Sequence, residues 1–81
     1  MTANAQDHLA LLRDLLIETG YEREAGKMNP ELTPKQVGLD SLTMLELLML
    51  VDERTGIEIT TDEVGLDTTF GELAEMISRK A

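Results

Sequence analysis

Asp40 and Ser41 are the residues of this 81-residue chain whose types and position point most directly to chemistry. They end a polar loop and open a run rich in Leu and Met that extends to Val51. Ser41 is therefore predicted where a helix starts, close to backbone N–H groups that lack intrahelical partners and to the positive end of the helix dipole. A hydroxyl at such a place is suited to carry a covalently attached phosphate group, although Asp or Ser there can also serve only as a helix cap.

Two other kinds of site fit the sequence poorly. A serine hydrolase needs Gly-x-Ser-x-Gly around its nucleophile, and Leu39 and Thr43 stand where those glycines would be. The one histidine, His8, is predicted on a different helix. A calcium-binding loop that starts at Asp52 would need glycine where Ile57 stands. Because the chain has no cysteine, a disulfide, a thiolate metal site and a catalytic thiol are excluded.

The charge of the chain is strongly acidic and unevenly spread. Ten acidic residues and one base, Arg54, lie between positions 40 and 75, and the formal net charge is −9. Such a field repels nucleic acid and anionic membranes and attracts basic protein surfaces. No apolar run approaches the roughly 20 residues of a membrane span, and the first residues do not have the pattern of a signal peptide. We therefore expect a cytoplasmic protein that binds neither nucleic acid nor membranes.

The apolar periodicity predicts an all-α fold, a small four-helix bundle with three main helices and one short helix, in a single domain of residues 1–81. The first helix is expected over residues 6–19, with Asn4 as candidate cap and Gly20 as its stop. Residues 21–39 show no sustained period and read as a long loop with a helical turn near residues 33–36. Three apolar side chains are expected to hold this loop to the core: Met28, Leu32 and Val37.

The second main helix is expected from Ser41 to Thr55, with Gly56 as its stop. One stripe of its side chains forms the natural core face: Met44, Leu47, Leu48 and Val51. A second stripe, Leu42, Leu45 and Met49, is either buried by a second neighbour or exposed as a binding strip with an acidic rim. In so small a domain we expect part of it to be exposed.

Two Thr-x-x-Glu patterns follow, and each is typical of a capped helix start. The first, at residues 60–63, comes after a short extended segment and predicts a short third helix that Gly65 ends. The second, at residues 69–72, opens the final helix, with Arg79 and Lys80 in its last turn. The apolar face of that helix consists of Phe70, Leu73, Ala74 and Ile77.

The order of these features over nearly the whole chain resembles that of acyl carrier proteins. The segments that carry the resemblance are Gly38-Leu39-Asp40-Ser41-Leu42, Gly56-Ile57-Glu58-Ile59 and Thr68-Thr69-Phe70. The resemblance implies that Ser41 accepts 4'-phosphopantetheine from coenzyme A through a separate magnesium-dependent phosphopantetheinyl transferase. It also implies that Asp40 helps this transferase to recognise the chain. The thiol of this arm would hold acyl groups as thioesters, and the chain would be a carrier with no catalytic site of its own.

The resemblance also implies the partners of such a carrier. They are the transferase and acyl-loading and condensing enzymes with basic docking surfaces, and the carrier itself is expected to be a monomer. The side chains that match the family's recognition helix are Leu42, Leu45, Glu46, Met49, Asp52 and Glu53.

Some positions depart from the pattern of fatty-acid carriers and favour polyketide or other specialised-metabolite biosynthesis. Thr43 stands where an acid is common, Arg54 interrupts the acidic helix, and the loop before Gly38 reads Leu-Thr-Pro-Lys-Gln-Val. A peptidyl or aminoacyl carrier is an alternative, although such proteins usually have Gly-Gly before the serine and are less acidic. A second alternative is an unmodified acidic adaptor whose second helix only docks partners.

Overall fold

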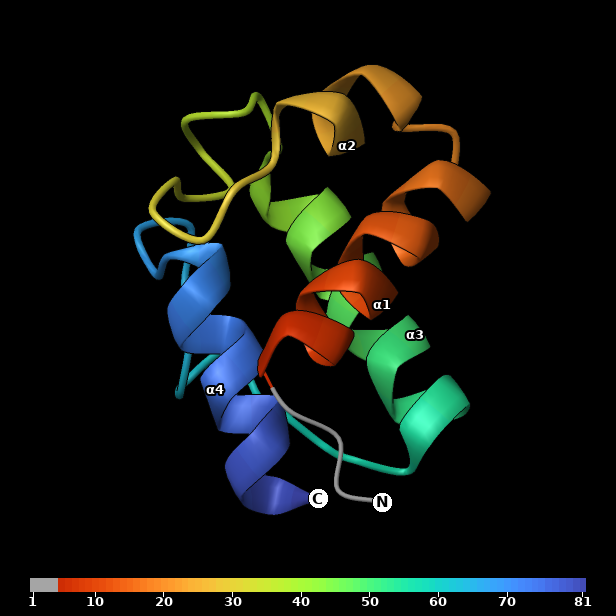
Figure 1. Ribbon diagram of the computed structural model, residues 1–81, viewed down its shortest axis with the longest axis vertical. Helices are drawn as coiled ribbons and strands as arrows, with labels where there is room; N and C mark the ends of the chain where they lie inside the picture. The colour runs from red at the N-terminus through yellow and green to blue at the C-terminus, as the bar shows by residue number, and fades with distance from the viewer. Residues whose placement is uncertain (1–4) are drawn as a thin grey trace.

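The computed structural model describes residues 5–81, and this part of the chain folds into four α-helices and no strand (Figure 1). They are α1 (Ala5–Glu18), α2 (Glu22–Lys27), α3 (Ser41–Thr55) and α4 (Phe70–Lys80). The first helix packs against each of the other three. The predicted all-α bundle of three main helices and one short helix is confirmed, and the candidate cap Asn4 lies outside the described residues.

The short helix, however, lies in a different place from the one predicted. It is α2, inside the segment expected to be a loop. Ala25 is buried there, and the charges suit the helix dipole, with Glu22 and Glu24 in the first turn and Lys27 in the last. Six residues with one buried side chain give no visible period, and packing against α1 supplies the stability that propensity does not.

The prediction of a helix at residues 60–65 is wrong, because this segment forms only a turn. The backbone N–H of Thr60 does donate to Glu63 Oε2 at 2.9 Å. The Thr60 hydroxyl, however, also points to this oxygen, at 3.3 Å, instead of accepting from the Glu63 N–H as a capping box requires. Lys80 of α4 binds the same carboxylate. The Glu63 side chain therefore joins this turn to the end of α4 rather than starting a helix.

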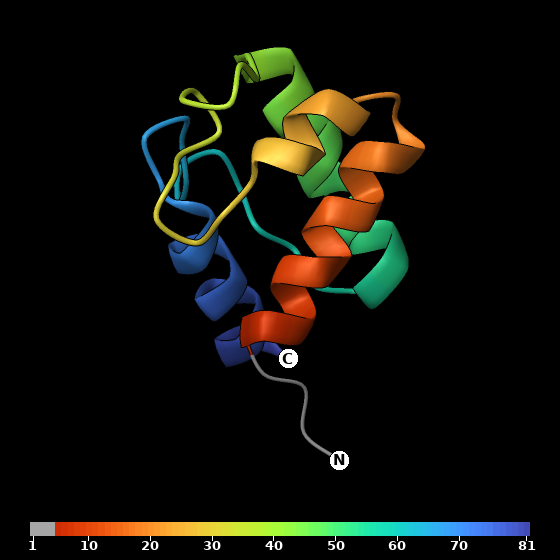
Figure 2. The same ribbon diagram turned by 45° about the horizontal axis from the view of Figure 1, so that its top comes forward.

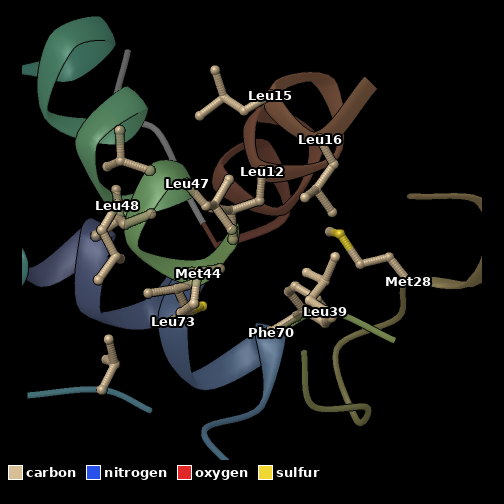
Figure 3. Close-up of a cluster of buried hydrophobic side chains, with 14 of the residues drawn as sticks. Leu12, Leu15, Leu16, Met28, Leu39, Met44, Leu47, Leu48, Phe70 and Leu73 are labelled. Atoms are coloured by element: carbon tan, nitrogen blue, oxygen red, sulfur yellow. The ribbon is translucent and has the colours of Figure 1, made fainter. Parts of the chain in front are cut away.

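The core is one cluster of side chains from all four helices, from the long α2–α3 connection and from the segment between α3 and α4 (Figure 3). The predicted core stripe of α3 is buried throughout, as is the predicted apolar face of α4. Phe70 is the largest fully buried side chain. On α1 the fully buried residues are Leu12, Leu15 and Leu16.

The connection between α2 and α3 is held by side chains and by hydrogen bonds to the start of α4. Met28 and Val37 are buried, and Leu32 packs partly buried against the core, as predicted. The backbone N–H of Phe70 donates to the carbonyl of Leu32 at 2.9 Å, and that of Gly71 donates to Pro30 at 2.9 Å. The connection thereby satisfies N–H groups that the first turn of α4 cannot pair internally.

The predicted turn at residues 33–36 and the predicted cap at residues 69–72 are both present, and each is held by a reciprocal pair of hydrogen bonds. At residues 33–36 the Thr33 N–H donates to Gln36 Oε1 at 2.8 Å, and the Gln36 N–H donates to Thr33 Oγ1 at 3.2 Å. At the start of α4, Thr69 and Glu72 form the same reciprocal pair. Each pair fixes the direction in which the chain enters the next element.

Candidate functional site

Ser41 is the first residue of α3, and its side chain is exposed. The approach to it is set by Gly38, whose φ of 98° is in the left-handed region that favours glycine. The Leu39 N–H then donates to the carbonyl of Pro34 at 2.9 Å, and the Leu39 side chain is buried. A buried residue thus anchors the chain immediately before two exposed polar ones. Figure 2 shows this start of α3 at the same end of the molecule as α2.

Asp40 is the N-cap of α3. Its Oδ1 accepts from the backbone N–H of Thr43 at 2.9 Å, and its carbonyl accepts from the Met44 N–H at 3.0 Å. The bond from the Thr43 N–H is the largest cause that holds the pKa of Asp40 below its ordinary value, followed by the bond from the Thr43 side chain. The Asp40 side chain thus pairs one N–H group of the first turn, that of Thr43, which has no intrahelical partner.

Thr43 connects this cap to the junction between α1 and α2. It is a buried polar residue, 4% exposed, and its Oγ1 lies 2.9 Å from Asp40 Oδ1 and 3.0 Å from the hydroxyl of Tyr21. Since an ionised carboxylate only accepts and a threonine hydroxyl has one hydrogen, Thr43 donates to Asp40 and accepts from Tyr21. Tyr21, Thr43 and Asp40 therefore form a relay of hydrogen bonds that ends beside Ser41.

The second apolar stripe of α3 faces outward. Leu42 is 66% exposed, Leu45 44% and Met49 59%, so a helix buried on both sides is ruled out. The acidic residues along the same helix are exposed as well: Glu46, Asp52 and Glu53. An exposed apolar strip with an acidic rim is suited to bind a partner surface that combines apolar and basic groups.

Two grooves flank this strip, and Met49 lines both of them. One has a volume of about 280 Å³ and lies between α3 and residues 58–61, with Leu45, Leu48 and Ile59 in its walls. The other, also of about 280 Å³, lies between α3 and the end of α1 at Thr19. Met49 therefore lies on a ridge between two hollows.

Comparison with known proteins agrees with this geometry. Residues 11–77 match the family model described as "Phosphopantetheine attachment site". The chain belongs to this family. Over 53 residues it is 40% identical to "Acyl carrier protein, mitochondrial" of Dictyostelium discoideum. This match covers 64% of the chain and 44% of that relative, so the chain spans less than half of the relative's length. No solved structure matched the chain.

Family membership identifies 4'-phosphopantetheine as the carrier's prosthetic group. It also places the chain among carriers, which hold a substrate for other proteins, rather than among enzymes. In residues 5–81 no group of His, Asp and Glu could hold a metal ion. Across the same described residues, no helix is both long enough and apolar enough to cross a membrane.

His8, the one histidine, and Arg54, the one base of the acidic stretch, each contact a side chain of another helix. His8 is buried, and its Nδ1 lies 2.7 Å from the hydroxyl of Ser78, which joins α1 to α4. Arg54 contacts both carboxylate oxygens of Glu18 at 2.9 and 3.0 Å. The only base of the acidic stretch therefore lies beside an acid of α1.

Thr43 and Tyr21 are the site residues that sequence reasoning missed. From the sequence, Thr43 stands out only by its departures from the hydrolase and fatty-acid-carrier patterns, and Tyr21 has no predicted role. Their hydrogen bond joins positions 22 apart in different elements, so no local spacing reveals it. The available signal was that Thr43 lies next to Met44, on the edge of the helix face that is turned to the core.

Proposed function

We propose that Ser41 is the residue to which the carrier's 4'-phosphopantetheine is attached. The observation that supports this most strongly is the difference between two neighbouring hydroxyls. Ser41 is exposed at the first position of α3, whereas Thr43 is buried and its hydroxyl is hydrogen bonded to both Asp40 and Tyr21. An exposed hydroxyl at a helix start leaves room for a bulky phosphodiester, so the residues around Ser41 fit the group.

Attachment is a phosphoryl transfer to the Ser41 hydroxyl. The serine oxygen attacks the phosphorus atom of coenzyme A that carries pantetheine, and a bond from Ser41 Oγ to phosphorus forms. The bond from that phosphorus to adenosine 3',5'-bisphosphate breaks, and the hydroxyl proton passes to a base of the transferase. Asp40, next to Ser41, presents its carboxylate to the magnesium-dependent transferase. When bound, the arm supplies a terminal thiol that holds acyl groups as thioesters.

The exposed strip of α3 is the docking surface for the enzymes that load and use the acyl group. The apolar side chains Leu42, Leu45 and Met49 give contact area, and Glu46, Asp52 and Glu53 attract basic partner surfaces. The transferase and the acyl-loading and condensing enzymes would use the same strip in turn. The arm attached at one end of this surface then reaches the active site of whichever enzyme is docked.

Polyketide or another specialised-metabolite pathway is our proposal for the acyl groups carried. It rests on Thr43, Arg54 and the loop before Gly38, where the sequence departs from the common fatty-acid pattern. The likeness to a mitochondrial acyl carrier protein favours a fatty-acid role instead, and an aminoacyl cargo is a further alternative. Loading assays with acyl and aminoacyl thioesters distinguish these cargoes.

Three further properties remain predictions: the monomeric state, the cytoplasmic location and the extent of the carrier domain, residues 1–81.

Incubation with coenzyme A and a broad-specificity phosphopantetheinyl transferase, followed by intact-mass measurement, tests the attachment. We expect the parent chain to gain one phosphopantetheine group and Ser41→Ala to gain none. Thr43→Ser is a matched control, since it keeps a hydroxyl two residues away and should gain one group. An unmodified adaptor would stay at the mass of its polypeptide in every sample.

A further inference from the structure

We infer that Tyr21 is a positioning residue for the modification of Ser41, acting through the hydroxyl of Thr43 on the carboxylate of Asp40. This inference rests on the proposed function, because it concerns how the chain presents Ser41 to the transferase. It assigns a role to a residue of the α1–α2 junction, 20 positions before the serine in the sequence.

The relay fixes the direction of each hydrogen bond. Asp40 Oδ1 accepts from both the N–H and the hydroxyl of Thr43, each at 2.9 Å. The Thr43 hydroxyl has one hydrogen, which the carboxylate takes, so the 3.0 Å contact with Tyr21 is donated by the tyrosine. Hydrogen bonds in such a chain polarise one another. Tyr21 therefore strengthens the bond that holds the Asp40 carboxylate in one orientation.

Tyr21 is itself held in place by the fold. Its N–H donates to the carbonyl of Leu16 at 2.8 Å, and its carbonyl accepts from the Ala25 N–H at 2.9 Å. Its ring packs partly buried against the core. The hydroxyl is thus presented to Thr43 from a backbone position tied to α1 on one side and α2 on the other. Substitution by Phe keeps the ring and removes only the hydroxyl.

The test is a double-mutant cycle on the rate of modification. We expect Tyr21→Phe to lower kcat/KM of the transferase for the carrier by about 2- to 10-fold, the range for loss of one neutral hydrogen bond. In an Asp40→Ala background the same substitution should have no further effect, because the group on which it acts is gone. Thr43→Val should lower the rate at least as much as Tyr21→Phe, and Thr43→Ser should restore it.

A second readout does not depend on the transferase. NMR titration of the Asp40 carboxyl should show that its pKa rises toward the ordinary value in Tyr21→Phe and in Thr43→Val, and stays low in Thr43→Ser. A Tyr21 that only packs in the core would leave this titration unchanged.

The outcomes separate this inference from the proposed attachment. If the parent chain is modified and Tyr21→Phe reacts at the parental rate, only the role of Tyr21 is overturned. An equal loss of rate with and without Asp40 would also overturn it, since the effect would not pass through the carboxylate. If the parent chain gains no group, the proposed function fails, and the titration of Asp40 still decides whether the relay exists.

Discussion

The backbone N–H of Gly71 donates to the carbonyl oxygen of Pro30 at 2.9 Å, and a Cβ atom added to Gly71 would lie 2.8 Å from that same oxygen. A side chain at position 71 therefore displaces the connection from the start of α4. We expect Gly71→Ala to lower the free energy of unfolding by about 1–3 kcal/mol, measured by chemical denaturation.

Gly26 provides the matched control for that substitution. It lies inside α2, its φ is not in the left-handed region, and an added Cβ would meet nothing within 4 Å. Gly26→Ala should be neutral or raise the free energy of unfolding by up to about 1 kcal/mol, because alanine is the better helix former. Equal effects of the two substitutions would contradict the close contact at Pro30.

Leu48 and Met49 are neighbours on α3 that face opposite environments. Leu48 is 4% exposed and Met49 is 59% exposed. Leu48→Ala should cost about 2–5 kcal/mol of stability, whereas Met49→Ala should change it by no more than about 0.5 kcal/mol. Thermal and chemical unfolding measure both. A large loss of stability in Met49→Ala would mean that the exposed strip is part of the core rather than a docking surface.

Charge reversal on the rim of the strip should weaken docking. We expect Glu46→Lys to raise the Kd for a basic partner such as the transferase, and the binding of the parent to weaken as salt is added. Glu75→Lys makes the same change in net charge at an exposed position of α4 and should have a smaller effect. Affinities that do not depend on salt, or equal effects of the two reversals, would argue against electrostatic docking on α3.

Acid should unfold the protein in a defined pH range. The pKa values of Asp40, Glu63 and Glu72 lie below their ordinary values of 3.8, 4.5 and 4.5, chiefly because of hydrogen bonds from the Thr43 N–H, Lys80 and the Thr69 N–H, respectively. A carboxylate with a lowered folded-state pKa stabilises the fold fully above its unfolded-state pKa, and this contribution is lost as the pH falls through the folded-state pKa.

Self-repulsion acts in the opposite direction, since the net negative charge falls as the pH approaches the sequence pI of about 4.3. We therefore expect Tm to be level or to rise from pH 7 to about pH 5 and to fall below about pH 4. Circular dichroism melts across this range measure it. Asp40→Asn, which keeps a good cap, should reduce the loss on the acid side. A Tm that keeps rising below about pH 4 would contradict this account.

The parts of the fold that local signals determine could be predicted from the sequence. The bounds of α3 follow from Asp40 before it and from Gly56 after it, where φ is 76° and the Gly56 N–H donates to the Asp52 carbonyl at 2.7 Å. The core face of α3 follows from its period. The position of Ser41 at the helix start follows from the same cap.

The parts that tertiary contacts determine could not be predicted. Helix α2 depends on the burial of Ala25 against α1, and the Glu63 carboxylate is bound by Lys80, which no local pattern shows. The hydrogen bond from Tyr21 to Thr43 is of the same kind. Sequence reasoning therefore placed Ser41 at the helix start, and it missed what holds the cap beside it in place.

The most direct test of the account is to locate the attached group by tandem mass spectrometry. Trypsin cleavage after Lys35 and Arg54 releases residues 36–54, in which the only hydroxyl side chains are Ser41 and Thr43. After modification by the transferase we expect the phosphopantetheine group on Ser41 alone. A group found on Thr43 or on any other peptide, or no group at all, would contradict the account.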